Sequence, residues 1–121
     1  MKTGVIILGH GSRTVEANQV FDSIVEMVKE EIDYEIVEKA SMELAKPSLA
    51  QSIEKVVKAG VKKVIVVPLF LFPGIHIQED IPKLIKLEQK KYPEVEFIFG
   101  RNIGADQKIA ELMVERVKEV G

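Results

Sequence analysis

The chain contains no cysteine and only two histidines among its 121 residues. The absence of cysteine excludes disulfides, thiolate metal sites and cysteine nucleophiles. The apolar run over 64–72 is far shorter than the roughly 20 residues that a membrane-spanning helix requires. A net charge of -2, with lysines scattered among glutamates, provides no general field for nucleic acid. We therefore expect neither a membrane nor a nucleic-acid partner.

The first residues also lack the pattern of a secretory signal peptide, because they lead directly into a strand pattern without a cleavage region. This favours a cytoplasmic protein. A hydrophobic fraction of 46% and a charged fraction of 30% are typical of a soluble globular chain. The length predicts one domain, residues 1–121.

Four short apolar segments alternate with four segments of helical period, which predicts an α/β fold with a parallel sheet. The expected strands are 2–8, 34–42, 63–71 and 95–100. The expected helices are 14–31, a second that has Pro47 in its first turn and ends at Gly60, a third capped by Asp80, and a fourth capped by Asp106. We expect the fourth helix to bury an apolar stripe formed by Ile109, Leu112, Met113, Val117 and Val120.

The first and third strands are almost wholly apolar, as in strands that are covered on both faces. Both should therefore be central, and right-handed crossovers then give the strand order 2-1-3-4 in a three-layer αβα sandwich. Such a sheet opens a ligand crevice at the carboxyl ends of its two central strands.

Both histidines follow these two strands. His10 lies between Gly9 and Gly11, and His76 follows the strand-breaking pair Pro73 and Gly74. Imidazole is both a metal ligand and a proton carrier near neutral pH, so a shared site is expected to act on a metal or a proton. Two histidines are too few for a closed structural zinc site, and they suit a site that binds a metal and releases it.

Charged residues follow the strands at the same edge. Glu43 comes after the second strand and can join the imidazoles, although most of the fifteen glutamates must be solvated. Arg13 and Arg101 come after the first and fourth strands, where an arginine fork can bind a carboxylate or phosphate. A surface ion pair is an equally good interpretation of both arginines.

The motifs together resemble the class II tetrapyrrole chelatases, and in particular the short, single-domain sirohydrochlorin cobaltochelatases of the CbiX type. The resemblance covers essentially the whole chain. It depends on the order and spacing of the segments LGHGSR at 8–13, MELAKPSL at 42–49, VPLFLFPGIH at 67–76, DIP at 80–82 and GAD at 104–106.

This resemblance implies a chelatase-like fold and the insertion of Co²⁺ into sirohydrochlorin, a step in the anaerobic, early-cobalt route to cobalamin. It implies a homodimer, because longer members look like two such domains fused. His10 and His76 match the family histidines that hold the metal and accept pyrrole protons, and Glu43 matches the family glutamate. The metal is a substrate, so no permanently bound cofactor is expected. Arg13, Lys46 and Arg101 are the candidates for binding the carboxylates of sirohydrochlorin.

Other functions remain open. Nickel or ferrous iron also accept imidazole ligands, and affinity order alone does not select the metal in a cell. The same histidines can serve a non-catalytic metal carrier. A phosphatase that uses His10 as nucleophile is a weaker alternative, because histidine phosphatases have arginine before the histidine and this chain has Gly9 there.

Overall fold

The computed structural model describes residues 2–75 and 79–121. Within these residues, the strands form one parallel sheet in the order β2-β1-β3-β4, which confirms the predicted topology. The strands are β1 (Thr3–Gly9), β2 (Ile36–Ser41), β3 (Lys63–Pro68) and β4 (Glu96–Phe99). β2 and β3 are shorter than predicted, because Leu69 and Met42 already belong to the loops at the carboxyl edge.

The helices are α1 (Val15–Glu31), α2 (Leu49–Lys58), α3 (Ile81–Lys91) and α4 (Gln107–Val120). None of the helices in the described part of the chain is long and apolar enough to span a membrane. Thr14 caps α1, and Asp106 caps α4 as predicted. The predictions for the first residues of α2 and α3 are wrong in two details. Ser48 forms a capping box at α2, so Pro47 lies before this helix, and Asp80 makes no side-chain capping bond at α3.

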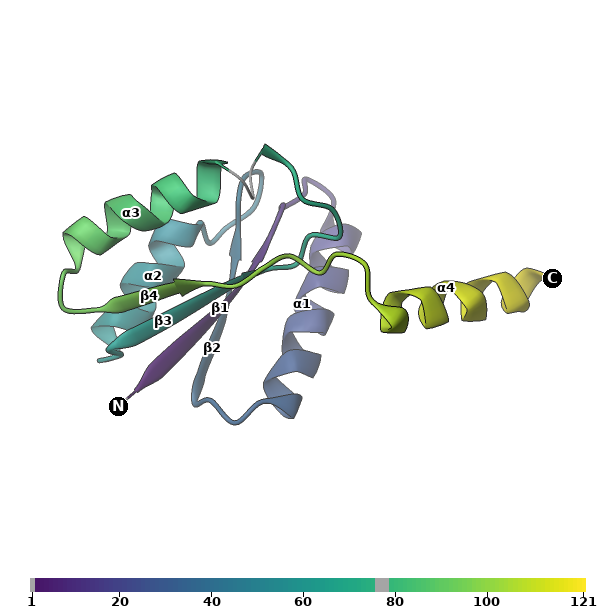
Figure 1. Cartoon of the computed structure of the whole chain (residues 1–121), viewed down its shortest axis with the longest axis horizontal. Helices are drawn as coiled ribbons and strands as arrows, with labels where there is room; N and C mark the ends of the chain where they lie inside the picture. Colours follow the sequence, from purple (N-terminus) through teal and green to yellow (C-terminus); the bar gives the residue numbers. More distant parts are fainter. Residues whose placement is uncertain (1, 76–78) are drawn as a thin grey trace.

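The sheet is covered on both faces (Figure 1). On one face α2 packs on β1 and β2 and α3 packs on β4, and the fully buried residues there include Ile6, Val66, Ile53 and Ile81. On the other face α1 packs with Val25 against Val5, Ile7 and Val37. Adjacent residues of β1 therefore face opposite helical layers, which explains why this strand has no polar alternation.

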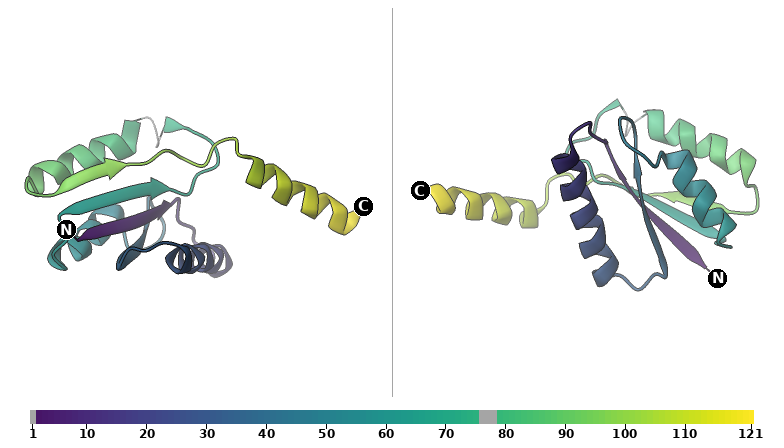
Figure 2. Two further views of the ribbon diagram at one scale, coloured as in Figure 1. Left: turned by 60° about the horizontal axis from the view of Figure 1, so that its bottom comes forward. Right: turned by 180° about the vertical axis from the view of Figure 1, so that it is seen from behind.

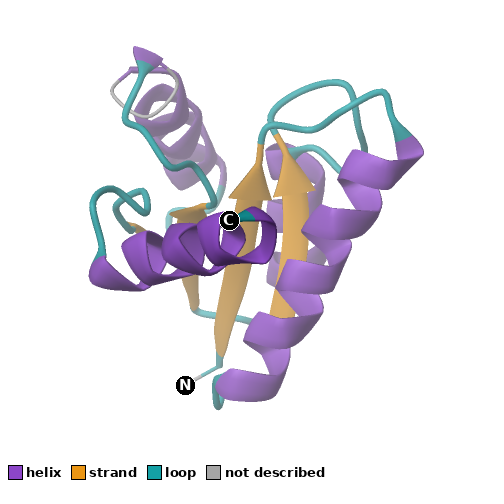
Figure 3. Cartoon of the chain, turned by 90° about the vertical axis from the view of Figure 1, so that its right-hand side faces the viewer, coloured by secondary structure: helices purple, strands orange, loops and turns teal. Residues whose placement is uncertain are grey.

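Helix α4 is the main departure from the expected fold. Figures 1 and 2 show it extending away from the body of the molecule, and Figure 3 shows it running obliquely in front of the sheet. None of its residues is buried, and Met113 and Val117 are 58% and 62% exposed. The prediction that its apolar stripe belongs to the core is therefore wrong for a single chain. The stripe is present, but it contacts no sheet face of its own chain.

The same sheet leaves an apolar position open at its β4 edge. Strand register pairs Val5 with Ile65 and Ile65 with Ile98, which places these side chains on the α1 face. Helix α1 packs over the β1 and β2 side, and Ile98 stays 37% exposed. One uncovered apolar position and one unpartnered apolar helix thus occur in the same chain.

Candidate functional site

The imidazole of His10 lies at the carboxyl edge of the sheet, directly after β1. It stacks on the ring of Phe70, with ring centroids 3.8 Å apart and planes inclined by only 6°. Phe70 comes just after β3 and is 4% exposed, whereas His10 is exposed. A buried aromatic ring thus supports the imidazole of an exposed histidine and restrains its plane.

Backbone hydrogen bonds place Glu43 beside the histidine loop. The amide of Met42 donates to the carbonyl of Gly9 at 2.9 Å, and the amide of Glu43 donates to the carbonyl of His10 at 3.1 Å. These bonds continue the pairing of β1 with β2 beyond the strands. The backbone of Glu43 therefore lies at the same sheet edge as His10, as expected. Glu43 is exposed there.

Neighbouring atoms lie so close to the two glycines around His10 that neither position has room for a Cβ. Gly11 has a φ of +88°, and a Cβ at this position would overlap the carbonyl oxygen of Glu43. A Cβ on Gly9 would come within 2.9 Å of the Phe21 ring. The two glycines therefore allow α1 and the β2–α2 loop to close around the histidine.

The start of α1 holds the remainder of the loop. Asn18 donates to the carbonyl of Ser12 at 2.9 Å, and the amide of Thr14 donates to the Ser12 hydroxyl at 3.1 Å. Ser12, Asn18 and Phe21 also line a recess of about 160 Å³ that includes His10. The histidine thus borders a small hollow whose walls combine apolar side chains with Ser12 and Asn18.

Two of the three predicted carboxylate-binding residues line one cavity. Arg13 and Lys46 border a space of about 300 Å³ between α1 and the β2–α2 loop. Arg101 follows β4, at the other end of the sheet edge, and it does not line this cavity. Lys39 and Asp22 also line it, and neither was predicted from the sequence. Lys39 lies two residues before the end of β2 on the face that α1 covers, a position that strand alternation can identify.

His76 lies outside the described residues, so the predicted pair of histidines stays a prediction. Among residues 2–75 and 79–121, no group of three or more histidine, cysteine or acidic side chains is placed to hold a metal ion.

An apolar groove of about 410 Å³ lies between the loop after β3 and the start of α4, lined in part by Leu71, Phe72 and Ile109.

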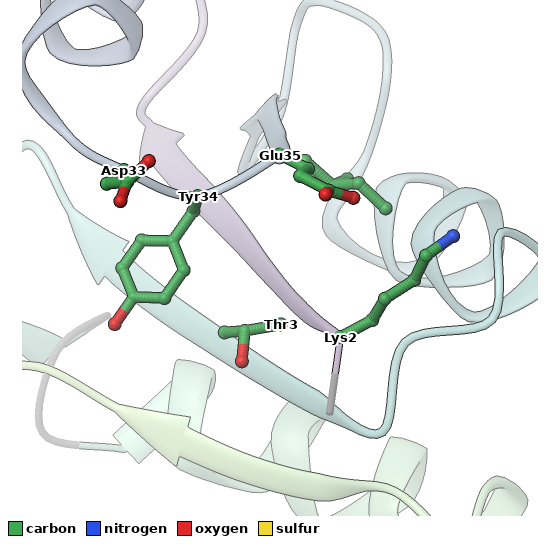
Figure 4. A pocket seen from close by; sticks show the side chains of 6 residues that line it. Lys2, Thr3, Asp33, Tyr34 and Glu35 are labelled. Carbon is green, nitrogen blue, oxygen red and sulfur yellow. The ribbon is translucent and has the colours of Figure 1, made fainter.

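A further cavity, of about 390 Å³, lies at the opposite edge, where the strands begin (Figure 4). Its walls include Lys2, Thr3, Tyr34 and the carboxylates of Asp33 and Glu35. It is separated from His10 by the length of β1. None of the residues singled out from the sequence lines it, so the carboxyl edge carries the candidate site.

Residues 4–120 match the family model of CbiX. The chain belongs to the CbiX family. Among curated relatives, this CbiX chain is 36% identical to the sirohydrochlorin cobaltochelatase of Methanopyrus kandleri, over 95% of this chain and 94% of the relative. It is 37% identical to the chloroplastic sirohydrochlorin ferrochelatase of Arabidopsis thaliana, over 95% of this chain but only 51% of the relative.

A solved structure has the same fold. The sirohydrochlorin chelatase SirB from Bacillus subtilis subspecies spizizenii, in complex with cobalt, matches this CbiX chain with a TM-score of 0.95 and 31% identity. The match covers 99% of this chain and 51% of SirB. Because nearly the whole chain superposes, the extended position of α4 is shared with a protein about twice as long.

Proposed function

We propose that this CbiX protein inserts Co²⁺ into sirohydrochlorin, in the anaerobic early-cobalt route to cobalamin. The observation that supports cobalt is the match to relatives that are named sirohydrochlorin cobaltochelatase. The cobaltochelatase of M. kandleri is matched almost end to end, whereas the ferrochelatase of A. thaliana is matched over half its length. Both relatives have a name that contains the same tetrapyrrole, and this supports sirohydrochlorin as the second substrate.

The chemistry requires a group that can release a metal and accept protons. As Co²⁺ enters the ring, two pyrrole N–H bonds break, nitrogen–cobalt bonds form, and two protons leave to bases near the ring. A neutral imidazole performs both tasks near neutral pH. In the proposal His10 and His76 present the ion and take protons, and Glu43 assists proton removal or orients a histidine.

The site of His10 supports this assignment. His10 is exposed, and the stack on Phe70 restrains the plane of its imidazole. The backbone amide of Glu43 donates a hydrogen bond to the backbone carbonyl of His10. A flat macrocycle approaching the carboxyl edge can therefore meet an imidazole that needs no reorganisation. Arg13, Lys46 and Arg101 are proposed to bind the ring carboxylates.

The test is anaerobic spectrophotometry of purified protein with sirohydrochlorin and Co²⁺, Ni²⁺ or Fe²⁺ in turn, against metal and tetrapyrrole without protein. We expect the spectral change to be fastest relative to this background with Co²⁺, and to slow by at least about 100-fold in His10→Ala, the scale of losing a general base. A faster rate with Ni²⁺ or Fe²⁺ would reassign the metal. Tight metal binding without acceleration would indicate a metal carrier instead.

We propose in addition that the working form is a homodimer in which α4 of each copy packs on the other copy. Full burial of one valine, leucine or methionine side chain contributes about 1.5–3 kcal/mol, so an exposed stripe along α4 forfeits several kcal/mol in one isolated chain. Ile98 at the β4 edge offers a place for such a helix. The doubled length of SirB, which shares the extended helix, supports a second copy as the occupant. The crevice between the two copies would hold the ring.

A further inference from the structure

The cavity that contains Arg13 and Lys46 has a third cation within it. We name it the Lys39 cavity, and its walls are Ser12, Arg13, Asn18, Phe21, Asp22, Lys39, Ser41, Leu44, Ala45 and Lys46. Among these described residues, three side chains are positively charged and Asp22 alone is negatively charged. The cavity therefore carries a local positive charge in a protein whose net charge is -2.

Lys39 is held in place by the sheet and by α1. Strand register pairs it with Ile7, which places it on the α1 face of β2. Its Nζ lies 2.6 Å from an Asp22 carboxylate oxygen, and the two side chains are 37% and 45% exposed. Because an ammonium has three donors, Lys39 can bind a second carboxylate while it keeps this ion pair.

The Lys39 cavity adjoins the histidine. Ser12, Asn18 and Phe21 line both this cavity and the recess that includes His10. A molecule whose centre lies at the imidazole can thus extend a peripheral group past these shared walls into the cavity. Sirohydrochlorin has this form, because its ring edge bears flexible carboxylate side chains.

We propose that the Lys39 cavity binds a peripheral carboxylate of the tetrapyrrole, with Lys39 as the binding residue that acts together with Arg13 and Lys46. Asp22 acts against this binding, because it competes for the ammonium and repels the incoming carboxylate. Lys39 thereby sets affinity and orientation of the ring over His10 and takes no part in proton transfer. This inference rests on the proposed function for the identity of the ligand.

The chain provides a matched control on the same strand. Glu38 forms an ion pair with Lys55 of α2 at 2.9 Å, and Lys55 is absent from the walls of the Lys39 cavity. Lys39→Gln and Lys55→Gln each remove one positive charge and one ion pair between β2 and a helix. Only the first variant removes a cation from the cavity.

The experiment measures the dissociation constant of metal-free sirohydrochlorin by absorbance titration, and KM and kcat for cobalt insertion. In Lys39→Gln we expect the dissociation constant and KM to rise about tenfold, as for one charge-assisted hydrogen bond, with kcat at saturation unchanged. Lys39→Arg should restore most of the affinity. Lys55→Gln should match the wild type, and circular dichroism verifies that each variant is folded.

Asp22→Asn separates ligand binding from a structural role. If Lys39 binds the substrate, removal of the competing carboxylate should lower the dissociation constant, by about twofold to fivefold for a half-exposed pair. If the ion pair only stabilises the fold, Asp22→Asn should weaken binding as Lys39→Gln does, and the inference is then wrong. The inference is also wrong if Lys39→Gln and Lys55→Gln bind sirohydrochlorin equally well while both insert cobalt.

The proposed function can fail separately. A wild-type protein that binds sirohydrochlorin in a Lys39-dependent manner but inserts none of the three metals would overturn the chelatase assignment. The same result would support the Lys39 cavity as a carboxylate site.

Discussion

His10 and Phe70 form a parallel stack, with centroids 3.8 Å apart, between a residue that follows β1 and one that follows β3. The two residues are 60 positions apart in the chain, and the pairing of β1 with β3 brings them together. Backbone hydrogen bonds connect each residue to a neighbouring loop: the amide of Glu43 donates to the carbonyl of His10, and the amide of Ile103 donates to the carbonyl of Phe70. The orientation of the imidazole is therefore a property of the whole sheet edge.

Phe70→Leu should lower kcat for metal insertion about tenfold while the KM for sirohydrochlorin changes little. Leucine keeps the apolar burial but removes the flat ring that restrains His10, so the imidazole gains orientations that do not lead to transfer. Steady-state kinetics measures this split. Phe97→Leu is the matched control, because Phe97 packs against the same core cluster within β4. Equal losses of kcat in both variants would show a general effect on the core instead.

Gly11→Ala should destabilise the protein and reduce activity more than Gly60→Ala. Both glycines have positive φ, +88° and +95°, and alanine at either position costs about 1 kcal/mol for the backbone conformation. Only at Gly11 would the new Cβ also overlap the carbonyl of Glu43, since nothing lies within 4 Å at Gly60. Urea unfolding and the insertion rate measure the two effects. Equal destabilisation would mean that the β2–α2 loop moves aside freely.

Val117→Glu should convert the proposed dimer into a monomer without unfolding it. Val117 is 62% exposed in the single chain, so glutamate costs little there, but it would carry a charge into an apolar contact between copies. Light scattering coupled to size exclusion measures the mass. The neighbouring substitution Lys118→Gln changes the charge by the same amount and should leave the dimer intact. A wild-type protein with the mass of one chain would contradict the exchange of α4.

The ion pair of Glu54 and Lys58 on α2 should stabilise the fold only in the pH range where both groups are charged. The hydrogen bond and charge of Lys58, 2.8 Å away, lower the pKa of Glu54 below 4.5, and the reciprocal contacts raise the pKa of Lys58 above 10.5. The contribution of Glu54 is complete above 4.5 and disappears as pH falls through its folded pKa. That of Lys58 is complete below 10.5 and disappears as pH rises through its folded pKa.

Urea midpoints of Glu54→Gln and Lys58→Gln, at one protein concentration, measure this window. Each variant should be slightly less stable than the wild type at neutral pH, because both side chains are exposed and the pair is screened by water. The difference for Glu54→Gln should vanish in acid. A difference that persists unchanged well below pH 4.5 would show that the glutamine affects α2 by another route.

Local sequence was sufficient for the strand order, the position of the His10 loop and the capping of α4. Apolar runs without alternation identify β1 and β3 as central, and right-handed connections then leave one strand order. The same reasoning placed His10 and Glu43 at one edge, where the structure joins their backbones. The resemblance carried by the motifs supplied the family.

Tertiary contacts decided the rest. The stripe of α4 indicates a buried face, but helical period alone cannot say which chain buries it, and here it is not the body of its own chain. The stack of His10 on Phe70 and the inclusion of Lys39 in the cavity with Arg13 depend on strand register and on the approach of α1. The sequence by itself determined which residues reach the carboxyl edge, because that depends on local pattern and chain connectivity. Only the folded chain decided which of them meet, because contacts between distant segments follow from packing.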